Sequence, residues 1–229
     1  MSGAVLLDAL GTLVTFAPPA PRLRALLAER HGVEVSESEA AAAMTAEIRH
    51  YRAEHDSAVD AASLAALRRD CARVLRDALP ARVHGDLGDI DALTQTLVDA
   101  IAFAPYPETV EVLQELRRRG HPLAIVSNWD VSLREVLDRT GLAPLVDAVV
   151  ISAELGVGKP HPRPLHAALE ALGAPAQGAV HVGDTHAEDV LGARAAGVRP
   201  VLIVRDDAPA PDDDALAVID DLRGLLTLS

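Results

Sequence analysis

The sequence predicts an α/β protein whose parallel sheet is interrupted by an inserted helical domain. From residue 104 onward, short apolar segments alternate with helical segments, which is typical of a parallel, doubly wound sheet. Residues 20–102 instead show helical periodicity without a strand pattern, and only one apolar segment, residues 4–7, precedes them. The helical segment therefore follows the first strand of a Rossmann-like α/β core. We assign residues 1–16 and 104–229 to this core and residues 17–103 to a helical cap domain.

From residue 107 to residue 204, the core helices and strands are expected to alternate. Glycine readily adopts the left-handed conformation that follows a helix, so a glycine indicates where a helix ends. Three of the helical segments are followed by such a residue, at Gly120, Gly141 and Gly197. Strands are predicted at 4–7, 123–127, 148–152, 179–182, 200–204 and 216–219, and helices at 107–119, 131–140, 163–172, 187–196 and 220–226. The acidic, proline-containing segment 206–214 is predicted to be a solvated loop.

The inserted segment predicts a bundle of about four helices. Ser36 and Glu39 have the spacing of a capping box at the start of an alanine-rich helix that reaches about His55. A first helix is expected between Pro21 and Gly32, and two more helical periods lie at 60–79 and 89–102.

Composition limits the possible partners and location. The chain has 229 residues and a formal net charge of -13, which argues against nucleic acids and anionic membranes as partners. Cys71 is the only cysteine, so an intrachain disulfide is impossible. No apolar run approaches the roughly 18 residues of a membrane span, and the first residues form a strand pattern rather than a signal peptide. We expect a cytoplasmic monomer or homodimer that binds a small, anionic molecule.

Polar clusters follow four of the predicted core segments. In an open parallel sheet, ligands bind beyond the carboxyl ends of the strands, so these clusters should share one edge. Lys159 is the only lysine beside 20 arginines, which favours a functional role for it. The clusters are Asp8-Ala9-Leu10-Gly11-Thr12, Ser127-Asn128-Trp129, Gly158-Lys159-Pro160 and Gly183-Asp184 with Asp189 downstream.

These four motifs, in this order and with helices inserted after the first, resemble the haloacid dehalogenase superfamily of aspartate-nucleophile hydrolases. The resemblance covers the whole chain. Asp8 is then the candidate covalent nucleophile, because a carboxylate at a strand end can attack phosphorus or carbon. Lys159 would supply a positive charge to the substrate and hold Asp8 ionised.

The resemblance also implies a Mg²⁺ ion, which prefers oxygen ligands. The carboxylates of Asp8 and Asp184 and the backbone carbonyl of Leu10 would hold the ion, with Asp189 as an indirect or water-mediated ligand. The resemblance, and the position of these residues in the motifs, imply further contacts with the phosphate group or the rest of the substrate. They would come from Thr12, Ser127, the backbone N–H of Asn128, and Trp129. For Trp129, simple packing in the core is an equally good interpretation.

One position departs from the phosphatase pattern. Phosphatases of the superfamily carry a second aspartate two residues after the nucleophile, which protonates the leaving alcohol and then activates water; here that residue is Leu10. Such acid–base help is typically worth ~10²–10⁴ in rate.

Three interpretations follow from this departure. The first is a Mg²⁺-dependent phosphatase for a small phosphorylated metabolite, weak or restricted to good leaving groups such as acyl or aryl phosphates. The second is a 2-haloacid dehalogenase, since halide leaves without a proton, although those enzymes need no metal and lack the acidic pair Asp184 and Asp189. The third is a binding or regulatory protein that has lost catalysis.

Overall fold

The computed structural model describes residues 3–205 and 214–228, so residues 206–213 of the predicted acidic loop lie outside the described part. The chain forms two compact units. The core unit contains residues 1–15 and 104–229, and the helical unit contains Phe16–Phe103.

The described residues of the core unit form a six-stranded sheet in which every pair of neighbours is parallel. This confirms the predicted α/β class. The central strands are buried along their whole length, which explains why they appear in the sequence as unbroken apolar runs. The strand order is β5 (Ala148–Ile151), β4 (Leu123–Ser127), β1 (Val5–Leu7), β6 (Val180–Gly183), β7 (Arg199–Ile203), β8 (Ala217–Ile219).

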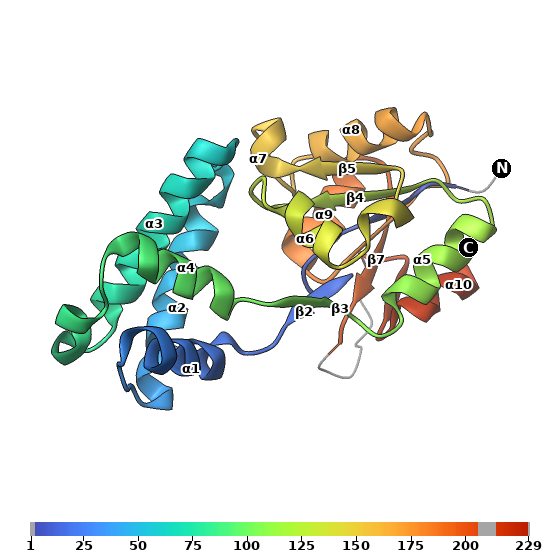
Figure 1. Ribbon diagram of the computed structural model, residues 1–229. Coiled ribbons are helices and arrows are strands. Elements are labelled where there is room, and N and C mark those ends of the chain that lie inside the picture. The colour runs from blue at the N-terminus through green and yellow to red at the C-terminus, as the bar shows by residue number, and fades with distance from the viewer. Residues whose placement is uncertain (1–2, 206–213, 229) are drawn as a thin grey trace. The chain divides into compact units, whose positions relative to one another are not determined.

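Helices cover both faces of this sheet (Figure 1). Leu6 and Val126 point to one face, where they pack with Leu165 of α8 and Ala193 of α9. Figure 1 shows α5 and α10 on the opposite side of the sheet from α8, as a doubly wound fold requires. The helices of the core unit are α5 (Thr109–Arg118), α6 (Leu133–Arg139), α7 (Ser152–Leu155), α8 (Arg163–Leu172), α9 (Leu191–Ala195) and α10 (Leu225–Leu228).

Two predicted helices of the core differ in detail. The segment predicted as a helix at 187–196 begins with a π-helical turn, His186–Val190, and becomes α-helical only in α9. The buried carboxylate of Asp189 accepts the backbone N–H of Thr185, which holds this wider turn in place. The helix predicted at 220–226 is a 3-10 turn, Leu222–Gly224, followed by α10. Single π-helical turns are frequent at functional sites.

Two short strands were not predicted. β2 (Val14–Phe16) and β3 (Phe103–Pro105) pair with each other where the chain enters and leaves the helical unit. The rings of Phe16 and Phe103 meet edge to face, with centroids 5.7 Å apart. Neither segment, Val-Thr-Phe or Phe-Ala-Pro, is the unbroken apolar run that made the equally short strands β1 and β8 recognisable.

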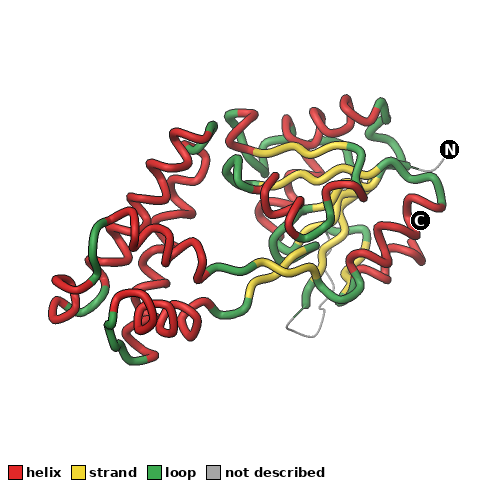
Figure 2. Tube along the Cα trace, viewed as in Figure 1, coloured by secondary structure: helices red, strands yellow, loops and turns green. Residues whose placement is uncertain are grey.

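Between these strands, the described chain forms helices and turns, as Figure 2 shows. The capping box is present: Glu39 N–H donates to Ser36 Oγ at 3.2 Å, and Ser36 N–H donates to Glu39 Oε2 at 2.7 Å. None of the helices in the described residues is long and apolar enough to cross a membrane. The long helices of this unit are α1 (Pro19–His31), α2 (Glu37–Glu54), α3 (Ala61–Ala78) and α4 (Ile90–Ala100).

A carboxyl group is buried inside the helical unit. Glu47 on α2 is 3% exposed, and its Oε2 has no hydrogen-bond partner among the described residues. Burial raises the pKa of Glu47 to about 7, although a hydrogen bond with the Cys71 side chain lowers it. The native state therefore holds a proton that the unfolded chain, with an ordinary glutamate pKa of about 4.3, has already lost by pH 6.

We predict that this group makes the protein less stable as the pH rises. The free energy of unfolding should fall between pH 4 and pH 7 and then level off, with a total loss of about 3 kcal/mol. Glu47→Gln should match the parent near pH 4 and be more stable at pH 8, measured by urea unfolding. Glu54→Gln, an exposed position on the same helix, is the control and should leave the pH dependence unchanged. An equal pH slope in the parent and in Glu47→Gln would contradict the assignment.

Candidate active site

The strand register brings the predicted polar clusters to one edge of the sheet. Leu7 lies opposite Ile125 on one side and Val182 on the other. The residues that follow these positions therefore leave the sheet at the same end. Asp8 N–H continues the ladder by donating to the Val182 carbonyl at 2.8 Å. The carboxyl ends of β1, β4 and β6 thus place Asp8, Ser127 and Asp184 together.

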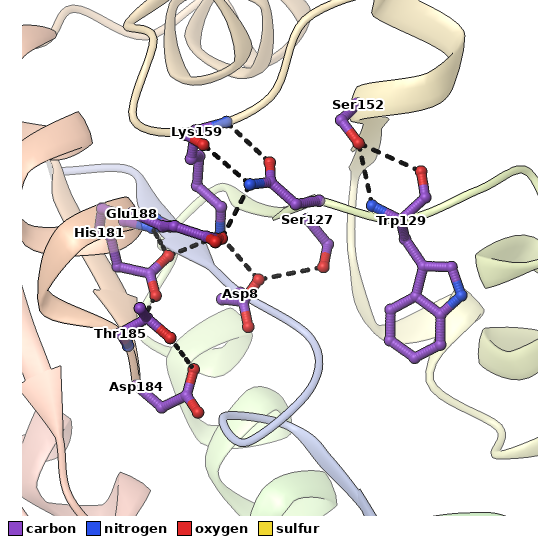
Figure 3. A network of polar contacts seen from close by, with 11 residues as sticks. Asp8, Ser127, Trp129, Ser152, Lys159, His181, Asp184, Thr185 and Glu188 are labelled. Carbon is purple, nitrogen blue, oxygen red and sulfur yellow. Dashed lines mark hydrogen bonds and ion pairs between the residues drawn. The ribbon is translucent and has the colours of Figure 1, made fainter. Parts of the chain in front are cut away.

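Lys159 lies between two carboxylates. Its Nζ is 2.7 Å from Asp8 Oδ1 and 2.6 Å from Asp189 Oδ1, and its side chain is only 1% exposed. Ser127 Oγ donates to the same Asp8 oxygen at 3.0 Å (Figure 3). Asp8 Oδ1 therefore accepts two hydrogen bonds, and its orientation is fixed from two neighbouring segments.

Burial and charge shift the pKa values of these groups in different directions. Burial raises the pKa of Asp8 to about 6, and Lys159 counteracts only part of that rise. Burial raises the pKa of Asp184 as well, and the nearby charge of Asp189 adds to the shift. For Asp189, burial also acts to raise the pKa, but Lys159 and the hydrogen bond from His181 outweigh it and hold the pKa below its usual range. Burial opposes the charge of Lys159, yet Asp8 and Asp189 raise its pKa above the usual range, so it stays protonated.

Oxygens of Asp8, Asp184 and Asp189 form a cluster in which one ligand atom from each lies within 4.8 Å of the others. Lys159 bonds to Asp8 and Asp189 but not to Asp184, so the cluster keeps an excess of negative charge that attracts a further cation. Oxygen donors of this kind suit a hard divalent ion such as Mg²⁺. The residues present therefore fit the predicted metal.

The loop after Asp8 approaches Asp184 so closely that only glycine fits at position 11. Gly11 has a φ of +79°, and a Cβ atom there would lie 2.1 Å from Asp184 Oδ2. The preceding residue, Leu10, is half-buried, and the loop closes through a bridge between Leu10 and Val14. The loop after Asp8 and the side chain of Asp184 thus lie against each other, with no room for a side chain at position 11.

Asn128 holds the Lys159 segment. Its Oδ1 accepts Lys159 N–H at 2.7 Å, and its Nδ2 donates to the Lys159 carbonyl at 2.9 Å and to Glu188 Oε2 at 2.8 Å. The sequence predicts a phosphate contact from the backbone N–H of Asn128. The structure adds a separate task for the side chain, which is to fix the position of Lys159.

Thr12 and Trp129, which were also predicted to bind substrate, are buried, as Ser127 and Lys159 are. Thr12 is fully buried, and its hydroxyl has no hydrogen-bond partner among the described residues. Trp129 is 5% exposed. Its backbone N–H donates to Ser152 Oγ at 3.0 Å, and its backbone carbonyl accepts from the same hydroxyl at 3.2 Å. In Figure 3 the indole ring lies apart from the contacts around Asp8 and Lys159. The packing interpretation of Trp129 accounts for this burial.

His181 was not recognised from the sequence. It lies on β6, is fully buried, and bonds through Nε2 to Asp189 Oδ1 at 2.9 Å. Its Nδ1 has no partner among the described residues, which favours the tautomer with the proton on Nε2. A histidine inside an otherwise apolar strand was the available signal. Its partner could not be predicted, because only the π-helical turn brings Asp189 within hydrogen-bond distance of His181 on β6.

We predict that His181 keeps Asp189 directed at Lys159. His181→Leu removes the donor and should lower hydrolytic activity roughly 10–100-fold, as loss of a residue that orients a catalytic group typically does. His181→Gln keeps an N–H donor and should retain most of the activity. Steady-state rates of both variants, with urea unfolding to compare their stabilities, test this. Equal activity in the leucine variant and the parent would refute it.

Known proteins resemble this chain in sequence and in fold. The sequence model of haloacid dehalogenase-like hydrolases matches residues 3–197. The phosphoserine phosphatase of Thermus thermophilus is 44% identical over 120 residues, which is 52% of this chain and 48% of the relative. The chain spans about half the length of the curated relatives it matches.

Solved structures resemble the whole chain. A HAD phosphatase from Thermococcus onnurineus is 25% identical, with a TM-score of 0.68 over 99% of this chain and 97% of that one. A 2-haloacid dehalogenase from Pseudomonas syringae is also 25% identical, with a TM-score of 0.66 over 100% and 98% of the two chains. With the family model covering most of its length and four motifs meeting at one edge of the sheet, the chain belongs to the haloacid dehalogenase-like hydrolases.

Proposed function

We propose that this protein is a Mg²⁺-dependent phosphatase that acts on a small phosphorylated metabolite through a covalent intermediate on Asp8. The observation that supports the proposal most is that Asp8 has two different sets of neighbours. One oxygen is bound by Lys159 and Ser127, while the carboxylate also belongs to an acidic cluster suited to a divalent cation. Relatives named as phosphoserine and glyceraldehyde 3-phosphate phosphatases support the same reaction class.

The acidic cluster supports Mg²⁺ as the cofactor. Asp8 and Asp184 would give one carboxylate oxygen each, and Leu10 its backbone carbonyl. Asp189 would act through a water molecule, because Lys159 and His181 bond to its Oδ1 and Thr185 N–H bonds to its Oδ2. When bound, the ion offsets the negative charge of the cluster and polarises the phosphate group.

The reaction then has two steps, transfer of the phosphoryl group to Asp8 and hydrolysis of the covalent intermediate. An Asp8 oxygen attacks phosphorus, the bond to the leaving oxygen breaks, and the phosphoryl group is transferred to Asp8. Water next attacks the same phosphorus, which releases inorganic phosphate and restores the Asp8 carboxylate. Lys159 keeps Asp8 ionised and offsets charge on the phosphoryl oxygens, and Ser127 Oγ and Asn128 N–H donate to those oxygens.

Leu10 narrows the substrate class. Its side chain cannot protonate a leaving alcohol, so departure must rely on the stability of the leaving anion. Acyl and aryl phosphates release such anions, whereas simple alkyl phosphates do not. We therefore propose that acyl and aryl phosphates are the better substrates.

Leu10 also favours a second candidate, a 2-haloacid dehalogenase. Halide needs no proton to leave, and one similar solved structure is a 2-haloacid dehalogenase. Asp184 and its approach to Gly11 weigh against this function, because displacement of halide by a carboxylate needs no cation cluster. The third interpretation, a binding role without catalysis, would show phosphate affinity without turnover.

One assay separates these functions. We expect phosphate release from acetyl phosphate and para-nitrophenyl phosphate in Mg²⁺, and its loss in EDTA. Asp184→Asn should reproduce the effect of EDTA, because it removes a charged ligand while keeping the size of the side chain. Chloride release from 2-chloropropionate that continues in EDTA would instead establish the dehalogenase. Phosphate release of equal rate with and without the metal would overturn the proposed cofactor.

A further inference from the structure

Arg205 lies just beyond the end of β7 and reaches back to the loop that follows Asp8. Its Nε donates to the carbonyl of Gly11 at 2.9 Å, and its Nη2 donates to the carbonyl of Thr12. Nearly 200 positions separate these residues in the sequence. One guanidinium group thus binds two successive carbonyls of the loop that carries the nucleophile.

The guanidinium is itself held on two sides. Its Nη1 is 2.8 Å from Glu108 Oε1, and its central carbon lies 3.4 Å from the centre of the Tyr106 ring. The side chains of Arg205 and Glu108 are only 11% and 4% exposed. An arginine in this setting uses its planar shape and several donors at once, which a lysine cannot do.

The next carbonyl of the loop is bound as well. The carbonyl of Leu13 accepts the backbone N–H of Tyr106 at 3.1 Å and the hydroxyl of Thr109 at 2.8 Å. Three successive carbonyls, from Gly11 to Leu13, are therefore held by Arg205, Tyr106 and the first residue of α5, Thr109. The backbone of the loop has little freedom to shift.

This loop determines the geometry of the cation cluster. It starts at Asp8, contains the carbonyl of Leu10, and brings Gly11 within contact of Asp184. A shift of the loop by a fraction of an ångström would change the distance between the two carboxylates. Groups that orient metal ligands typically affect metal affinity 10–100-fold.

We propose that Arg205 is a positioning residue that fixes the Asp8 loop and thereby sets the affinity of the site for Mg²⁺. The inference rests on the proposed function, since it assumes that the Asp8–Asp184 cluster binds the ion. Arg205 bonds to the carbonyls of Gly11 and Thr12 and to Glu108, not to a carboxylate of the cluster, so it would act through the loop backbone. An arginine with a purely structural role would instead contribute to stability and leave metal affinity unchanged.

The test compares Arg205→Lys with the parent by calorimetric titration of Mg²⁺ in the absence of substrate. The lysine keeps the positive charge but cannot bind both carbonyls and Glu108 together. We expect the Kd for Mg²⁺ to rise roughly tenfold, and the Mg²⁺ concentration for half-maximal phosphate release to rise in parallel. The KM for para-nitrophenyl phosphate at saturating Mg²⁺ should stay near that of the parent.

Arg117→Lys is the matched control. Arg117 also pairs with an acidic residue, Asp147, and donates to a carbonyl, that of Leu145, but it lies outside the proposed site. This variant should leave the Kd for Mg²⁺ unchanged. If Arg205→Lys does not fold, judged by circular dichroism, Glu108→Gln weakens the same support and should raise the Kd in the same direction.

A lower melting temperature with an unchanged Kd for Mg²⁺ in Arg205→Lys would overturn the inference and leave the proposed function intact. Failure of the parent itself to bind Mg²⁺ would overturn both, and the parent titration shows which case applies. An equal rise in Kd in Arg117→Lys would also contradict a specific role for Arg205.

Discussion

Asp8→Asn is expected to abolish phosphate release from acetyl phosphate and para-nitrophenyl phosphate, with a loss of at least about 10³-fold, as removal of a nucleophile produces in other enzymes. The amide that replaces the carboxylate is a poor nucleophile. It can still accept hydrogen bonds from Ser127 and Lys159, so the site should keep its shape. Initial rates in saturating Mg²⁺ measure the effect.

The control for this variant is Asp138→Asn on the exposed surface of α6, which should behave as the parent. Full activity in a folded Asp8→Asn protein would show that Asp8 is not the nucleophile. Retained halide release in that variant would exclude Asp8 from the dehalogenase reaction too, because both reactions require attack by the same carboxylate.

Leu10→Asp is expected to raise the rate of alkyl phosphate hydrolysis by about 10²-fold or more. The new carboxyl group would stand two residues after the nucleophile, where it could protonate the leaving alcohol and then take a proton from water. The largest gain should appear with the poorest leaving groups, so rates should be compared across alkyl and aryl phosphates.

Leu10→Asn separates proton transfer from polarity. It has the size of aspartate but cannot exchange a proton, so it should give no gain on alkyl phosphates. An unchanged rate in folded Leu10→Asp would show that another group already serves as the acid. An equal gain in both variants would show that polarity, not proton transfer, limits the parent.

Much of the core could be predicted because its central strands, β1 and β4, are buried along their whole length. Residues 123–127 and 163–172 were expected as a strand and a helix, and they form β4 and α8 with the same bounds. Apolar runs, helix caps and glycines act locally, so the sequence displays them directly. The strands β2 and β3 were missed because neither is an unbroken apolar run and each depends on a partner nearly ninety positions away.

In the candidate site, too, local sequence signals could be recognised and contacts between distant segments could not. Asp8, Ser127 and Asp184 were singled out because polar residues at strand ends stand out against apolar strands. Lys159 was singled out as the only lysine, and Asp189 as the acidic residue downstream of Asp184. The structure places them together. The supporting contacts of His181, Glu188 and Arg205 depend on which segments approach each other in three dimensions. No spacing in the sequence indicates those approaches. The assigned catalytic and metal roles remain predictions that the variants above test.

The most direct test of the account is mass spectrometry of protein quenched in acid during turnover of acetyl phosphate. Because Leu10 cannot activate water, breakdown of the covalent intermediate should be slow and the intermediate should accumulate. We predict a phosphoryl group on the peptide that contains Asp8, formed with Mg²⁺ and absent in EDTA and in Asp8→Asn. Steady phosphate release by the parent with no phosphoryl group on that peptide, together with an active Asp8→Asn protein, would contradict the account.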